Sequence, residues 1–82
     1  MRKFFFGSAP LGEGTVEYSL VTGASDADKG DYGVLVESGG ESALIPAVSV
    51  SRLRVQELLG MMCRGLVTPV TARDVTEDWL SA

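Results

Sequence analysis

Residues 32–46 read YGVLVESGGESALIP, and this stretch decides the fold. From Tyr32 to Val36, apolar side chains occupy every second position, which is the period of a strand with one buried face. The pair Gly39-Gly40 separates this run from a second apolar run over residues 43–47. Because glycine adopts positive φ at no steric cost, a Gly-Gly pair between two such runs predicts a two-residue β-hairpin.

More strands are expected on the N-terminal side of this hairpin. Residues 15–22 repeat the alternation and predict a strand, and the polar residues 23–30 predict a loop. Residues 3–8 could add a fourth strand, joined to the strand at 15–22 through residues 10–14. Pro46 has no N–H for a sheet ladder, so the last strand either ends there or turns that edge toward solvent.

The hydrophobic period changes after Pro46 and predicts two helices. In the first helix, four apolar residues at i, i+3, i+4 and i+7 form a single stripe. Either Ser49 or Ser51 can cap its start, and Gly65 suits a left-handed position just past its end. The stripe consists of Val55, Leu58, Leu59 and Met62.

The second helix is expected to begin with a capping box. Thr71 would be the N-cap, with Asp74 at the third helical position and a hydrophobic staple between Val70 and Val75. Trp79, one turn after Val75, is expected to pack in the core, although a role as a binding hot spot stays open.

These elements predict an α+β fold: an antiparallel meander of three or four strands, followed by two C-terminal helices packed on one face. Residues 1–82 form a single domain. Residues 1–14 are an N-terminal segment or an extra strand, residues 15–47 the meander, and residues 49–81 the two-helix segment.

The composition of the chain argues against several classes of protein. Apolar residues make up 45% of the chain, charged residues 22%, and the net charge is −4. No apolar run is long enough to span a membrane or to act as a secretory signal. Because a single cysteine excludes an internal disulfide, we expect a cytoplasmic protein. We also expect that it binds no membrane.

No recognisable catalytic or metal-binding constellation is present. The chain contains no histidine, so neither Cys63 nor any serine has the usual base, and a zinc site lacks ligands. The segment Asp26–Glu37 has the length of a calcium loop, but Asp31 stands where that loop needs glycine. We expect no enzymatic activity, no cofactor, no metal and no small-molecule ligand.

A helix-turn-helix around residues 64–68 is the alternative functional interpretation, and it would make the protein a transcription-related binding module. Its second helix, however, would carry one basic residue, Arg73, against Asp74, Glu77 and Asp78. Phosphates would repel that surface, so nucleic acid is not expected as a partner.

The triplet Phe4-Phe5-Phe6 is the candidate partner surface. Strand alternation places Phe4 and Phe6 on one side and Phe5 on the other, so at least one aromatic side chain is left uncovered. The sequence therefore predicts a non-enzymatic protein-interaction or self-associating module, with a second copy as the first candidate partner.

The chain resembles a family of short uncharacterised Firmicute proteins that is catalogued as a domain of unknown function. The resemblance covers about residues 15–80, and neither the Phe triplet nor residues 8–14 have a counterpart in it. It implies a bacterial cytosolic protein and transfers no site residues. The residues that carry it are Tyr18-x-Leu20, Tyr32-Gly33-Val34, Ile45 leading to Ser49, and Pro69 through Asp74-Val75-x-Glu77-Asp78-Trp79-Leu80.

Overall fold

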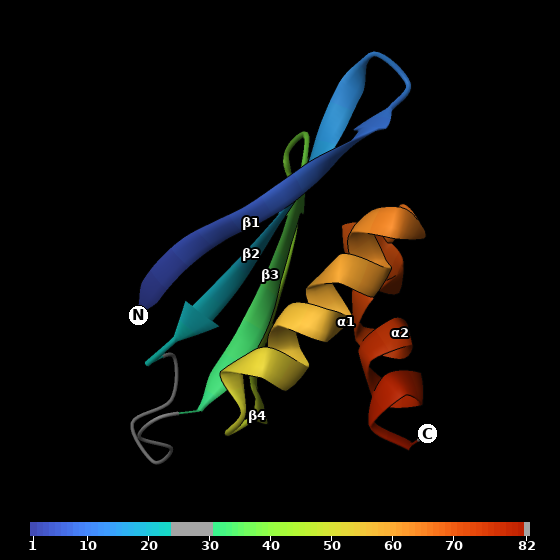
Figure 1. The fold of residues 1–82 in the computed structure, drawn as a ribbon. Helices are drawn as coiled ribbons and strands as arrows, with labels where there is room; N and C mark the ends of the chain where they lie inside the picture. Colours follow the sequence, from blue (N-terminus) through green and yellow to red (C-terminus); the bar gives the residue numbers. More distant parts are fainter. Residues whose placement is uncertain (24–30, 82) are drawn as a thin grey trace.

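A computed structural model describes residues 1–23 and 31–81. Four antiparallel strands come first in the chain and two helices follow, which confirms the predicted α+β fold with the larger number of strands (Figure 1). The sheet order is β1-β2-β3-β4, a simple meander. The elements are β1 Arg2–Leu11, β2 Gly14–Thr22, β3 Tyr32–Ser38, β4 Glu41–Ser49, α1 Arg52–Arg64 and α2 Pro69–Ser81.

Two tight turns connect the strands of the two hairpins. The β1–β2 and β3–β4 hairpins each close through two residues, and the first of these residues is a glycine. Gly12 and Gly39 both have φ of +59°, the positive φ that a type II′ turn requires at its first central position. The Gly39-Gly40 hairpin is confirmed, and only its first glycine uses positive φ.

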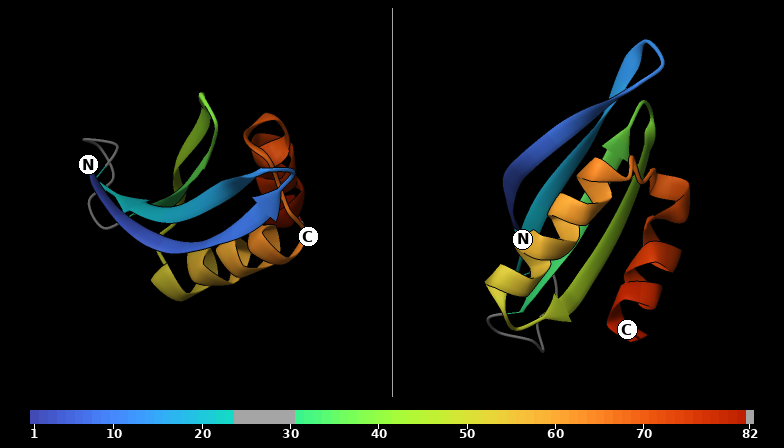
Figure 2. Two further views of the ribbon diagram at one scale, coloured as in Figure 1. Left: turned by 90° about the horizontal axis from the view of Figure 1, so that it is seen from above. Right: turned by 45° about the vertical axis from the view of Figure 1, so that its right-hand side comes forward.

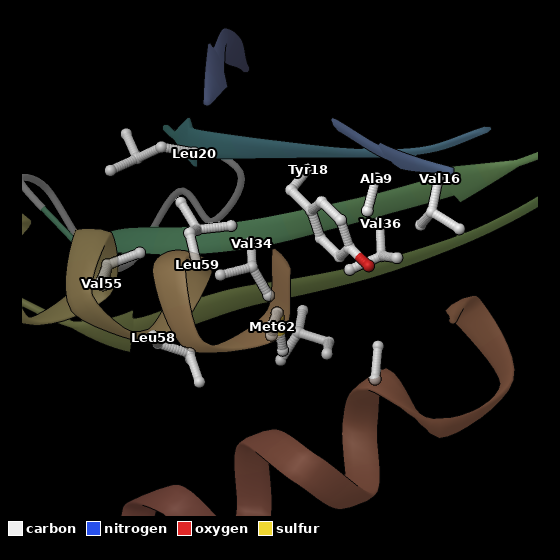
Figure 3. Packing of buried hydrophobic residues seen from close by; sticks show 12 residues of the cluster. Ala9, Val16, Tyr18, Leu20, Val34, Val36, Val55, Leu58, Leu59 and Met62 are labelled. Carbon is white, nitrogen blue, oxygen red and sulfur yellow. The ribbon is translucent and has the colours of Figure 1, made fainter. Parts of the chain in front are cut away.

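Both helices cover one face of the sheet (Figure 2). The predicted α1 stripe is confirmed, since all four of its residues are fully buried. They meet an apolar surface to which all four strands contribute, and Figure 3 labels the residues from β1, β2 and β3. From the strands, the core includes Val16, Tyr18, Leu20, Val34, Val36 and Ile45.

At the start of α1 the structure distinguishes the two candidate caps, and at its end it differs from the expected left-handed Gly65. Ser51 is the N-cap and accepts a hydrogen bond from the Arg54 N–H, while Ser49 accepts one from the Ser51 N–H. Gly65 does not take the left-handed position, because its φ is −88°. Leu66 takes it instead (φ +52°), and the N–H groups of Leu66 and Val67 close the helix end.

The start of α2 also differs from the expectation. The helix begins at Pro69, so Thr71 lies inside it and is not its N-cap. Pro69 suits a first helical position because its missing N–H would have no helical partner there. Val70 is 77% exposed and forms no staple with Val75. Within the described residues, no helix is long and apolar enough to cross a membrane.

Candidate interaction surface at the edge strand

The sheet has two edge strands, and they differ in the features that hinder pairing with a further strand. At the β4 edge, Pro46 removes a donor, and an irregularity in pairing places Ala47 at φ +55°. Helix α2 packs against β4, whereas it makes no contact with β1. At the β1 edge, in the part of the chain that the structure describes, β2 is the only pairing neighbour of a ten-residue strand. The β1 edge is therefore the more open one.

The Phe triplet lies on this open edge. Phe5 is 64% exposed, and Phe4 and Phe6 are each 40% exposed. Phe4 pairs with Leu20, a core residue, and therefore lies on the α1 side of the sheet. Phe5 pairs with Ser19 and lies on the opposite face. These positions agree with the strand alternation read from the sequence.

A β-bulge in β1 interrupts the alternation after Phe5. Ser19 pairs with Phe5 and the next residue back, Tyr18, pairs with Gly7, so Phe6 is an extra residue without a partner. The ring of Phe6 comes near Gly60 of α1, so it remains on the helix side. Beyond the bulge the strand is shifted in phase, which turns Ala9 into the core.

Phe4 lies beneath two arginines. The guanidinium of Arg2 is 5.5 Å from the centre of the Phe4 ring, and that of Arg52 is 5.8 Å from it. Both distances are within the range of a cation–π interaction. Sequence reasoning missed this arrangement because Arg52 is 48 residues away from Phe4 in the chain. We call Arg2–Phe6 together with Arg52 the aromatic edge.

Charges at the aromatic edge are unevenly distributed. Strand β1 contains Arg2 and Lys3 and no acidic residue. Lys3 reaches across β2 to Glu37 of β3, with 3.3 Å between Nζ and Oε1. The first turn of α1 contains no acidic residue either, and it begins with Arg52. A local positive surface therefore lies on a chain whose net charge is −4.

A second candidate surface lies between α1 and α2. Met61, Val75, Asp78 and Trp79 line an open pocket of about 330 Å³. Trp79 packs against the core with part of its ring exposed, and the Arg54 guanidinium lies 4.7 Å from the ring centre. Trp79 is thus both a core residue and a wall of this pocket. Nothing in the structure indicates what would occupy it.

The remaining reactive groups have structural contacts. Cys63, near the end of α1, faces β1, where its Sγ is 3.5 Å from the Ser8 carbonyl oxygen. The buried Tyr18 hydroxyl donates to the Val67 carbonyl oxygen at 2.6 Å and so ties the α1–α2 connection to the sheet. Burial, followed by the charge of Cys63, raises the pKa of Tyr18 above its ordinary value. In the described part of the chain, the hydrogen-bond partner of each group is a backbone carbonyl oxygen.

Metal ligands do not gather in the described part of the chain, where no three His, Cys, Asp or Glu side chains come together. In the segment weighed as a calcium site, Asp26–Glu37, residues 26–30 lie outside the described residues. A polar pocket lies on β2 and β3, on the sheet face opposite the helices. Its lining includes the cross-strand pair Glu17 and Glu37.

Comparison with known proteins places the chain in a family. A model for a family of unknown function, DUF6514, matches residues 8–82. The chain belongs to this family. The match includes residues 8–14, which were expected to have no counterpart, and it leaves the Phe triplet outside. No curated protein and no solved structure matches the chain.

Proposed function

We propose that this DUF6514 protein is a non-enzymatic protein-interaction module and that the aromatic edge is its contact surface. One observation carries the proposal: Phe5 is 64% exposed on the edge strand β1, and the part of this strand before residue 10 contains no proline that would interrupt pairing. An open edge offers unpaired backbone N–H and C=O groups to another chain, and an exposed aromatic side chain adds apolar area. The cytoplasm is the compartment we propose, because the single Cys63 forms no disulfide.

Self-association is the mode of contact that needs no other protein. The three Phe side chains expose roughly 300 Å² per copy if a whole side chain covers about 200 Å². Two copies would bury about 600 Å² of aromatic surface, roughly half of the smallest area typical of a stable interface. Self-association through this edge is therefore expected to be weak, in the micromolar to millimolar range.

Sedimentation equilibrium of the full chain from micromolar to millimolar concentration tests this proposal. Phe5→Ser removes the most exposed aromatic side chain of the edge and should weaken association. Val70→Ser is the matched control, because Val70 is 77% exposed on α2. Equal weakening by both variants would contradict a role for the edge. A monomer at millimolar concentration would remove self-association as the mode.

The helix-turn-helix alternative receives no support from the helices. Residues of α1 and α2 that would pack a helix-turn-helix unit are used against the sheet, among them Met62 and Ala72. The exposed surface of α2 carries Asp74, Glu77 and Asp78 beside the single cation Arg73. A phosphate backbone would be repelled by that surface.

A further inference from the structure

Within the described residues, the two arginines of the aromatic edge contribute no ion pair to the fold, whereas Lys3 does. Arg2 and Arg52 both approach the Phe4 ring, so two like charges share one aromatic side chain. Among the described residues, the only ion pair is Lys3–Glu37, and neither arginine takes part in one. Arg52 also lies at the positive end of the α1 macrodipole, where a cation is unfavourable. A negatively charged ligand would relieve all three costs.

The two sides of the edge differ chemically. The α1 side presents the two arginines over Phe4, and the opposite side presents Phe5. A strand added alongside β1 would turn successive side chains to opposite faces. Every second residue would then meet the arginines, and the residues between them would cover Phe5.

We propose that the aromatic edge binds an extended segment of a partner protein in which acidic and apolar residues alternate. The segment would add a fifth strand to the sheet, with its carboxylates at Arg2 and Arg52 and its apolar side chains over Phe5. This inference rests on the proposed function and names the partner's chemistry. A second copy fits less well, because its β1 would bring two more cations, Arg2 and Lys3, and no carboxylate to the edge. A nucleic acid would not use the backbone groups of the edge, and the chain's net charge of −4 opposes it.

Titration of the isotope-labelled full chain at low salt, followed by backbone amide NMR, tests this inference. The probe is the capped peptide (Glu-Val)4, compared with capped (Lys-Val)4 and with an oligothymidylate of eight nucleotides. We expect saturable shifts at Arg2–Phe6 and Arg52 with (Glu-Val)4 alone, and weaker binding as salt rises. Arg2→Gln combined with Arg52→Gln should weaken binding about three- to tenfold. Arg73→Gln, which makes the same change on α2 away from β1, should leave binding unchanged.

Four results would overturn the inference. Equal binding of (Lys-Val)4 would mean that carboxylates are not recognised, and tighter binding of the oligothymidylate would point to nucleic acid. If (Glu-Val)4 leaves the edge amides unshifted while Phe5→Ser weakens self-association, the inference fails and the interaction function stands. If the peptide does not bind and the chain is also a monomer at millimolar concentration, both fail together.

Discussion

Gly33 occupies a position in β3 that should tolerate no side chain. A Cβ placed on it would overlap the carbonyl oxygen of Ile45 and lie 2.7 Å from the Cα of Pro46. Carbon atoms in contact normally lie about 3.5–4.0 Å apart, so the overlap with Pro46 is roughly 1 Å. Both neighbours are backbone atoms of β4, and they cannot rotate away as a side chain can. Gly33→Ala must therefore push β4 off β3.

The expected cost of Gly33→Ala is about 3 kcal/mol, the upper end for overpacking a core. A chain of 82 residues is expected to have a total stability of about 4–12 kcal/mol. With a urea slope of about 1 kcal/mol per molar for a small protein, the unfolding midpoint should fall by about 3 M. Trp79 is the only tryptophan and its ring is partly buried, so its fluorescence can follow the transition.

Two other glycines separate steric overlap from backbone strain. Gly39 has nothing within 4 Å of its built Cβ but a φ of +59°, so Gly39→Ala should cost about 1 kcal/mol. Gly40 is equally open and its φ is not positive, so Gly40→Ala should change stability by less than about 0.5 kcal/mol. If Gly33→Ala unfolds at the same urea concentration as Gly40→Ala, the close approach of β4 to β3 is wrong.

Three further perturbations test local features of the fold. Ala47→Gly should raise stability by about 0.5–1 kcal/mol, or the melting temperature by about 4 °C, because φ is +55° at this exposed residue. Thr71→Ala should stay within about 0.5 kcal/mol of wild type in urea, since Thr71 lies inside α2; a loss of 1 kcal/mol would restore it as the cap. Tyr18→Phe should cost about 1–2 kcal/mol at pH 8. Burial raises the pKa of Tyr18, so its unfolded form ionises first and the wild type should lose stability relative to Tyr18→Phe above about pH 10.

The parts of the fold that were predictable depend on local periodicity. The α1 stripe was found because its four apolar residues repeat over two turns, and burial of that stripe is what holds the helix on the sheet. The Gly39-Gly40 hairpin was found because turn chemistry acts over two residues. The N-cap of α1 could not be chosen between Ser49 and Ser51, since both hydroxyls accept hydrogen bonds near the same helix end.

The parts that were missed depend on contacts between distant residues or on competing local signals. Thr71 matched a capping box, but Pro69 can begin a helix two residues earlier without losing a hydrogen bond. Gly65 was the natural left-handed residue, yet the chain places Leu66 there and packs its side chain against the core. The requirement for glycine at position 33 arises only when β4 pairs with β3.

The same division applies to the candidate surface. Alternation alone assigned Phe4 and Phe5 to opposite faces, because a strand fixes the direction of neighbouring side chains. Alternation could not predict the contact between Arg52 and Phe4, since that contact depends on how α1 lies across the sheet. A signal was nevertheless present in the sequence: Arg52 opens a helix that has no acidic residue in its first turn.

The asymmetry between the two sheet edges is the strongest reason to place a contact at β1. The β4 edge has Pro46, an irregular pairing and α2 against it, which are devices that prevent an edge from pairing with another chain. Strand β1 has a bulge at Phe6 and a proline at Pro10, and before the bulge its protective features are the charged residues Arg2 and Lys3. The part without a bulge or a proline, Arg2–Phe5, is also the part with aromatic and cationic side chains. The backbone groups of this segment are free of a second pairing strand within the described residues, which is why we propose the contact with a partner chain here and not at β4.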